Sequence, residues 1–246
     1  MIELEKSLLD TKQYRLITLS NSLECLLVSI DGNSITKKRE NAMQRCLKCF
    51  CYRKNKGEID SDSECLTSSA VVLNVGCGAY FDPKNCQGLS HFLEHMLSRS
   101  SKKYPKDNYF SNYLSTRGGE SGAFTRFLST TYHYTVNPEH LEKSLDIFAN
   151  FFLEPLILKS AVENEITAVE NEYNLAKSKD SVRIHILNHS LFKKETPFNN
   201  FNFGNIKSLC EMPKQQGFES YDLLRRHFEN YYSASKMKLT VQSKRK

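Results

Sequence analysis

Apolar residues recur at two different spacings along the chain, and the two spacings separate expected strands from expected helices. Runs rich in β-branched and aromatic residues predict strands at 14–19, 23–30, 70–75, 123–126, 131–136 and 238–242. Apolar positions three and four apart predict helices at about 87–98, 107–114, 137–152, 156–176, 182–192 and 221–231. Because strands and helices mix without regular strand–helix–strand alternation, the pattern predicts an α+β fold.

Between about residues 31 and 67 the pattern changes to a polar, charged stretch without a steady period. A compact domain rarely contains so long a loop unless the loop is functional or disordered. We therefore expect one domain over residues 1–246 that carries a loop-like or disordered insertion at about 31–67.

Charge and composition narrow the classes of function. The chain of 246 residues has a formal net charge of +6, and its basic excess lies mostly at 37–56 and 244–246. No basic stripe interleaved with aromatic residues is present, so we expect no nucleic-acid partner. No window approaches the ~20 apolar residues of a membrane span, and the N-terminus lacks a secretory signal, so we expect a cytoplasmic protein without a membrane partner.

Eight cysteines are present, and a chain of this length without a signal has little need of a disulfide framework. Four of them lie in or near the insertion: Cys46, Cys49, Cys51 and Cys65. Only one C-x-x-C pair occurs there, whereas a zinc ribbon needs two. We therefore interpret these cysteines as free thiols.

A five-residue run in the expected helix at 87–98 combines two histidines with an acid. His91 and His95 are four residues apart, so on a helix both imidazoles share one face and can bind one metal ion. A catalytic zinc site keeps three protein ligands and one open position for water. Glu94 lies beside both histidines and is the expected general base that accepts a proton from that water. The order H-x-x-E-H is the inverzincin motif.

A third metal ligand is expected from the acids of the helix that follows Pro155. Its core stripe consists of Val162, Ile166, Val169 and Tyr173. Glu165 and Glu172 are seven residues apart and share a face at the edge of that stripe, whereas Glu163 and Glu170 lie on the opposite face. Helical phase leaves open which of Glu165 and Glu172 is the ligand and which orients a histidine. Two half-buried acids without a cation nearby would be costly, which favours a metal.

Three segments together resemble the pitrilysin/insulysin metallopeptidases, and the spacing from His95 to Glu172 also fits that family. The segments are Gly88–Met96, Lys103–Pro105 and Ala168–Tyr173. Further segments resemble the nardilysin-like branch: Lys12–Arg15, Glu172–Ala176, Tyr231–Ala234 and Val241–Lys244. The resemblance covers nearly the whole chain except the insertion, and it implies a mixed, mainly antiparallel sheet packed against several helices.

The resemblance also implies a zinc peptidase site. It implies a single Zn²⁺ ion bound by His91, His95 and Glu172. It assigns Glu94 as the general base and Glu165 as an acid that supports a histidine. The resemblance therefore assigns the role of metal ligand to Glu172 rather than to Glu165, a choice that helical phase alone leaves open.

Peptide substrates are implied as well. In this family the substrate adds as a β-strand beside the strand that holds Gly122, Ala123 and Phe124. Nardilysin-like enzymes cut peptides at basic residues. Gly122 is a departure, because the family usually has Asn at this position and one substrate contact is then missing.

Length is the larger departure. Members of this branch contain several such domains, and their two halves close around the peptide. The second half supplies Arg and Tyr side chains to the substrate carbonyl, and losing such a donor costs about 100- to 1,000-fold in rate. We therefore expect this chain to bind zinc and to hydrolyse peptides poorly unless a second chain supplies the C-terminal half. The competing interpretation is a non-catalytic zinc-binding module that holds peptides or a partner chain.

Overall fold

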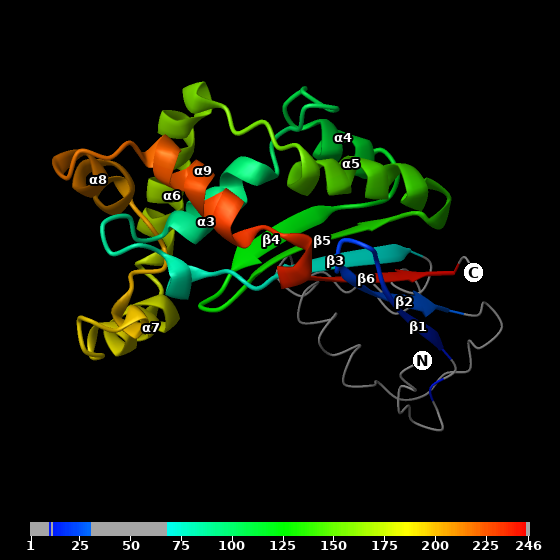
Figure 1. Ribbon diagram of the computed structural model, residues 1–246, viewed down its shortest axis with the longest axis horizontal. Coiled ribbons are helices and arrows are strands. Elements are labelled where there is room, and N and C mark those ends of the chain that lie inside the picture. The colour runs from blue at the N-terminus through cyan, green and yellow to red at the C-terminus, as the bar shows by residue number, and fades with distance from the viewer. Residues whose placement is uncertain (1–9, 11, 31–67, 245–246) are drawn as a thin grey trace.

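The computed structural model describes residues 10, 12–30 and 68–244. Six strands form one sheet in the order β1-β2-β6-β3-β5-β4 (Figure 1). The pairing of β2 with β6 is parallel and the other four pairings are antiparallel. This mainly antiparallel sheet with its helices confirms the expected α+β fold. The expected insertion at 31–67 and its cysteines lie outside the described residues.

The strands follow the expected β-rich runs within a few residues. Ser20, Asn21 and Ser22 form the turn of the β1–β2 hairpin, and the backbone N–H of Leu23 donates to Asn21 Oδ1 at 3.2 Å. The strands are β1 (Gln13–Thr18), β2 (Glu24–Ser29), β3 (Ser69–Val75), β4 (Ser121–Thr125), β5 (Thr130–Val136) and β6 (Met237–Ser243).

The described helices lie on one side of the sheet and beyond its β4 edge (Figure 1). They are α3 (Leu89–Leu97), α4 (Tyr109–Ser115), α5 (Leu141–Leu153), α6 (Val162–Ala176), α7 (Asp180–Ser190), α8 (Met212–Gln215) and α9 (Ser220–Tyr231). Short turns connect them: η1 (Ala79–Phe81), η2 (Pro138–His140), η3 (Lys159–Ala161), η4 (Pro197–Asn199), the π-helical η5 (Lys207–Glu211) and η6 (Ala234–Lys236). In the part of the chain that the structure describes, no helix is long and apolar enough to cross a membrane.

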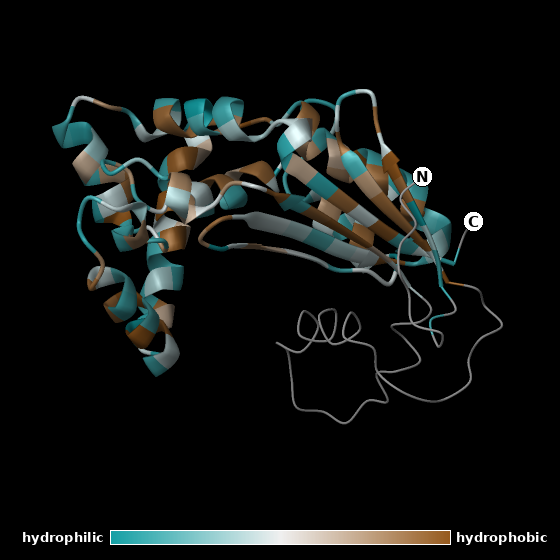
Figure 2. Cartoon of the chain, turned by 60° about the horizontal axis from the view of Figure 1, so that its bottom comes forward, coloured by the Kyte–Doolittle hydropathy of each residue, from teal (hydrophilic) through white to brown (hydrophobic). Residues whose placement is uncertain are grey.

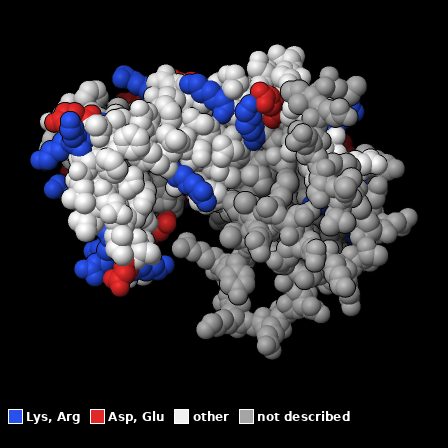
Figure 3. All heavy atoms as spheres, turned by 90° about the horizontal axis from the view of Figure 1, so that it is seen from below, with Lys and Arg blue, Asp and Glu red and all other residues white. Residues whose placement is uncertain are grey.

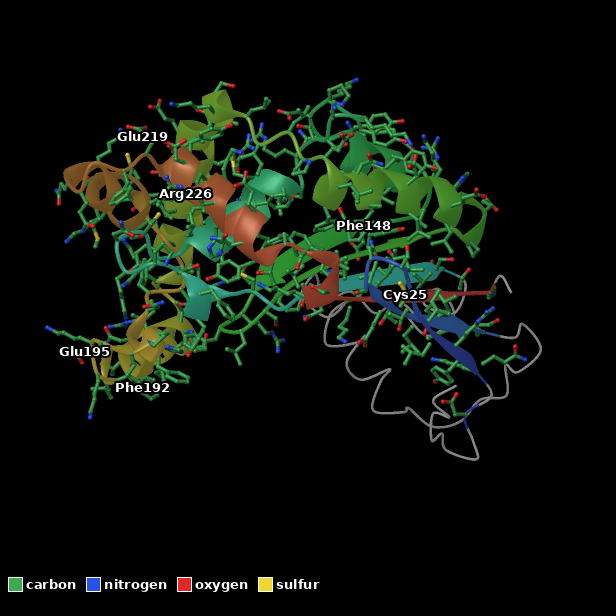
Figure 4. All side chains as sticks on the ribbon, in the orientation of Figure 1. Cys25, Phe148, Phe192, Glu195, Glu219 and Arg226 are labelled. Carbon is green, nitrogen blue, oxygen red and sulfur yellow. The ribbon has the colours of Figure 1, made fainter. Side chains whose placement is uncertain are left out.

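The core lies between the sheet and the helices α3, α4 and α5. Alternate residues of β3 are fully buried, among them Val71 and Val75, because successive side chains of a strand point to opposite faces. Figure 2 shows this alternation of apolar and polar residues along the strands. Phe148 of α5 points toward the sheet, and its ring centroid lies 5.1 Å from that of Tyr134 on β5 (Figure 4). This packing holds α5 against the sheet.

Two helix starts differ from the expectation. The helix after Pro155 begins only at Val162, because Pro155 bridges Ser101 in extended conformation and the backbone N–H of Leu156 donates to Ser100. Asp107 does not cap α4.

The N-cap of α4 is Asn108, whose φ of 57° lies in the left-handed region, while Asp107 forms an ion pair with Arg99. The helical segment 207–215 was not expected. Pro213 and the π-helical turn interrupt the 3.6-residue period from which helices are predicted.

Candidate metal centre

Helix α3 places two histidines at the edge of the core. Its apolar stripe is buried and includes Leu89, Phe92 and Leu93, and the histidines flank that stripe as expected. His91 and His95 lie one turn apart, with ring centroids separated by 4.9 Å. Their side chains are 12% and 24% exposed, so both imidazoles are mostly buried.

Glu172 of α6 completes a cluster with these histidines. One potential ligand atom from each of His91, His95 and Glu172 lies within 4.8 Å of the others. Glu172 Oε2 is 3.4 Å from His91 Nε2 and 3.3 Å from His95 Nε2. Two donors bound tetrahedrally to zinc at about 2.0–2.1 Å lie about 3.3 Å apart, so the distances from Glu172 to the two histidines are those expected of ligands that share one zinc ion.

The four acids of α6 have different surroundings. Glu165 and Glu172 both face α3, as helical phase predicts, and Glu163 is exposed. Glu170 is not simply a solvated acid, because its Oε2 accepts the backbone N–H of Ile206 at 2.8 Å. Between the two acids that face the site, Glu172 is the one near both imidazoles.

The orientation of His91 is fixed by a backbone carbonyl. His91 Nδ1 lies 2.6 Å from the carbonyl oxygen of Phe203, which can only accept a hydrogen bond. The proton of this contact is therefore on Nδ1, which leaves Nε2, the nitrogen that faces Glu172, as the one that could bind a metal. A ligand histidine held in this way is typical of protein metal sites. Periodicity could not have identified Phe203, because a carbonyl contact leaves no trace in side-chain type.

His95 is oriented by a carboxylate. Its Nδ1 lies 3.4 Å from Glu165 Oε2, which is the supporting contact expected for Glu165. The other oxygen of Glu165 is paired with the guanidinium of Arg99, which also contacts Asp107 at 2.6 Å. The expectation that no cation lies near these acids is therefore wrong. Arg99 follows His95 by four residues and lies just beyond Ser98, the C-cap of α3, so its nearness to His95 in the sequence was the signal that could have revealed it.

Glu94 is buried beside the histidines. It is 8% exposed, and its Oε2 accepts a hydrogen bond of 2.7 Å from Thr125 Oγ1 on β4. Burial raises the pKa of Glu94, although the neighbouring His91 and the Thr125 hydrogen bond lower it. The sequence did not indicate Thr125, because this contact joins segments far apart in the chain.

The metal-free cluster is strongly coupled electrostatically. Hydrogen bonds from His91 and His95 hold the pKa of Glu172 well below its usual range. Burial lowers the pKa of His95, but its contacts with Glu165 and Glu172 outweigh burial and raise it to about 9. The same balance raises the pKa of His91. A cation at this place is therefore stabilised by the acids around it.

Gly122, Ala123 and Phe124 lie on β4, which is at one edge of the sheet and has β5 as its single neighbour among the described strands. The N–H and C=O groups on its other side face away from the sheet, which is what strand addition requires. Opposite Gly122, the ring of His133 fills the space of a side chain, because a Cβ would lie 2.8 Å from His133 Cε1.

Two buried cysteines and two further histidines lie outside this centre. Cys77 and Cys86 are fully buried, and burial raises the pKa of each thiol to about 12, which fits small buried residues rather than reactive ones. His185 and His189 on α7 form a separate ring pair 4.4 Å apart. His185 lines a pocket of about 490 Å³ whose other walls include Thr125 and Phe203.

Charged side chains on the face shown in Figure 3 lie mostly toward the edges of the described surface. Lys and Arg are scattered there and do not gather into one continuous stripe.

The family follows from comparison with known proteins. The insulinase family (peptidase family M16) matches residues 60–201, which is more than half of the chain. The chain belongs to this family. The matched region contains the H-x-x-E-H run and Glu172, so the cluster described above lies within the family domain.

Relatives span the whole described fold. The chain is 36% identical over 233 residues to the A-factor-processing enzyme of Saccharomyces cerevisiae, covering 95% of this chain and 20% of the relative. It is 38% identical over 176 residues to nardilysin of Homo sapiens, covering 72% of this chain and 15% of the relative. A crystal structure of pitrilysin matches with a TM-score of 0.80 and 28% identity over 98% of this chain and 22% of that one.

These matches have two consequences. The match to the family model shows the family. The identities to the A-factor-processing enzyme and to nardilysin are similar, so they do not assign the chain to the nardilysin-like branch. The chain spans 20% of the length of the A-factor-processing enzyme and 15% of the length of nardilysin.

Proposed function

We propose that this chain is the zinc-binding domain of a metalloendopeptidase, with His91, His95 and Glu172 as the ligands. The observation that carries the proposal is the two contacts of Glu172 Oε2, at 3.4 and 3.3 Å from the imidazole nitrogens of two histidines one helical turn apart. Zinc bound there would supply Lewis acidity, which makes a water molecule a stronger acid at neutral pH. We also propose that residues 1–246 form a single domain with an insertion at 31–67.

Glu94 is the proposed general base. Its carboxylate accepts the hydrogen bond from Thr125 at 2.7 Å, which holds it on the side of α3 that faces β4. In this position it can take a proton from the attacking water and later deliver it to the departing amine. Burial raises its pKa, which strengthens it as a base relative to an exposed carboxylate.

Peptides are the proposed substrates. A peptide strand added beside Gly122–Phe124 would form backbone hydrogen bonds with the open side of β4 and would run past Thr125 toward Glu94. Backbone recognition of this kind tolerates many side chains. The finer proposal, cleavage at basic residues, rests on the resemblance to nardilysin-like enzymes.

A second candidate function is a zinc-binding module of weak or no activity that binds peptides or a partner chain, such as a second chain supplying the C-terminal half. It is suggested by the family resemblance, in which a second half contributes groups that stabilise the transition state, and by the match of these residues to 20% of the A-factor-processing enzyme.

One experiment separates the two candidates. Purified chain is assayed for bound zinc and for turnover of a dibasic peptide, beside Glu94→Gln and the control Glu163→Gln, an exposed acid of α6. The peptidase proposal expects one zinc per chain in all three proteins, and turnover that Glu94→Gln removes and Glu163→Gln retains. Zinc-loaded wild type without turnover would favour the binding module, and a chain that binds no zinc would exclude both.

A further inference from the structure

The helix that carries both histidines is capped by a residue outside it. The N-cap of α3 is Gly88, which has no side chain with which to bind the free N–H groups of the first turn. Asp82, six residues earlier, takes that place. Its Oδ2 accepts the N–H of Gly88 at 2.9 Å, and its Oδ1 accepts the N–H of Ser90 at 2.9 Å and the hydroxyl of Ser90 at 2.6 Å.

The space around Gly88 explains why the cap is external. Its φ is +85°, and a Cβ there would lie 2.2 Å from the Cα of Gly204. No capping side chain therefore fits at this position. The close approach of Gly204 matters to the site, because the preceding residue, Phe203, provides the carbonyl that holds His91 Nδ1.

Asp82 is itself tied to three parts of the fold. His227 of α9 has its Nε2 2.9 Å from the hydroxyl of Ser90, which donates to Asp82, so the imidazole is the donor in that contact. Asn200 Nδ2 donates to the backbone carbonyls of Ala79 and Asp82, at 2.9 and 3.2 Å. The turn before α3, the first turn of α3 and the segment that leads to Phe203 are thus connected through one residue.

Burying a carboxylate costs more free energy than capping a helix requires. The side chain of Asp82 is fully buried, and burial raises its pKa to about 7 despite the hydrogen bonds that lower it. An exposed helix is capped by Ser, Thr or Asn at its own first position without burying a carboxylate. The buried carboxylate secures the first turn of α3, while the backbone carbonyl of Asp82, through Asn200, ties the segment that leads to Phe203 to the same turn.

We propose that Asp82 is a positioning residue for the metal centre, fixing the first turn of α3 so that His91 meets both the Phe203 carbonyl and Glu172. This inference rests on the proposed metal site. Asp82 touches neither the metal ligands nor the substrate, and it acts through Gly88 and Ser90, the backbone that leads into His91.

The test compares two variants of Asp82 with a control from the same buried cluster. Asp82→Asn keeps the shape but replaces one acceptor with an NH₂ group that faces a backbone N–H. Asp82→Glu keeps the charge but displaces the oxygens by one methylene. The control His227→Leu removes the bond to Ser90 and leaves both backbone caps of α3 in place. Zinc affinity is measured by competition with a chromophoric chelator on protein shown to be folded by circular dichroism.

We expect zinc affinity to fall by about 10- to 100-fold in either Asp82 variant and to change by less than about threefold in His227→Leu, even where its melting temperature falls. In the metal-free protein, the ring Nδ1–H signal of His91 in NMR spectra should broaden by exchange with water in the Asp82 variants only.

Folded Asp82 variants that bind zinc within about threefold of wild type would overturn the inference, as would an equal loss in His227→Leu. Wild-type protein that binds no zinc would instead overturn the proposed function on which the inference rests.

Discussion

Thr125 Oγ1 on the edge strand β4 donates a hydrogen bond of 2.7 Å to the carboxylate of Glu94 on α3. The contact connects the residue proposed to move protons with the strand proposed to bind the peptide. Because Thr125 is the last residue of β4, its hydroxyl lies where an added peptide strand would pass closest to α3.

Replacing Thr125 by Val should lower the rate of peptide hydrolysis by about tenfold, since a hydrogen bond to a charged group contributes about 1.5–3 kcal/mol. Thr125→Ser keeps the hydroxyl and should retain most of the rate. The measurement is kcat and KM on one peptide, together with zinc content, which should stay at the wild-type level in both variants. Equal rates for the Val and Ser variants would show that this hydrogen bond does not serve the reaction.

Glu172→Gln should weaken zinc binding by at least about 100-fold, because it removes the only anionic ligand of the proposed set. Glu170→Gln is the matched control on the same helix. Its side-chain oxygen can still accept the N–H of Ile206, so zinc affinity should stay within about threefold of wild type. Chelator competition at pH 7.5 measures both. A similar loss in the two variants would argue against Glu172 as a ligand.

Zinc affinity should rise with pH between about 6.5 and 9. The pKa of His95 is raised from 6.5 to about 9 in the metal-free protein by its contacts with Glu165 and Glu172. A proton held on the ring must leave before the nitrogen can bind a metal, so each pH unit in this range should increase the apparent affinity by up to about tenfold. Competition measurements at pH 6.5, 7.5 and 8.5 test the slope, and an affinity independent of pH would contradict it.

Gly88→Ala should destabilise the fold more than Gly217→Ala, although both glycines have a positive φ. A Cβ at Gly88 would lie 2.2 Å from the Gly204 Cα, whereas a Cβ at Gly217 meets nothing within 4 Å. We expect about 1 kcal/mol for Gly217→Ala and at least about 2 kcal/mol more for Gly88→Ala, read from urea unfolding. Similar losses of unfolding free energy in the two variants would mean that the backbone around Gly88 can shift to accommodate a Cβ at little cost.

The local parts of the fold and site could be predicted from the sequence, because they depend on period. Helical phase placed Glu165 and Glu172 on the side of α6 that faces the histidines. It could not choose between them, because both acids approach His95 and only the three-dimensional distances separate them. The resemblance to the family, which includes the spacing from His95 to Glu172, assigned the role of ligand to Glu172.

What could not be predicted depends on contacts between distant segments. Phe203 contributes a backbone carbonyl, Thr125 comes from a strand 31 residues beyond Glu94, and Asp82 lies in what reads as an ordinary turn. Arg99 is different. Its position four residues after His95 was available in the sequence, and its charge invalidates the argument that the acids lack a cation.

The last strand of the described chain, β6, pairs with β2 on one side and β3 on the other. Among the described strands, β6 is the one that joins the β1–β2 hairpin to the rest of the sheet, and it lies far along the chain from that hairpin. Closing a contact over so long a stretch of chain is slow, and until it closes β2 and β3 each present an unpaired edge. Pairing of these edges with other chains should therefore be the main risk of aggregation during folding.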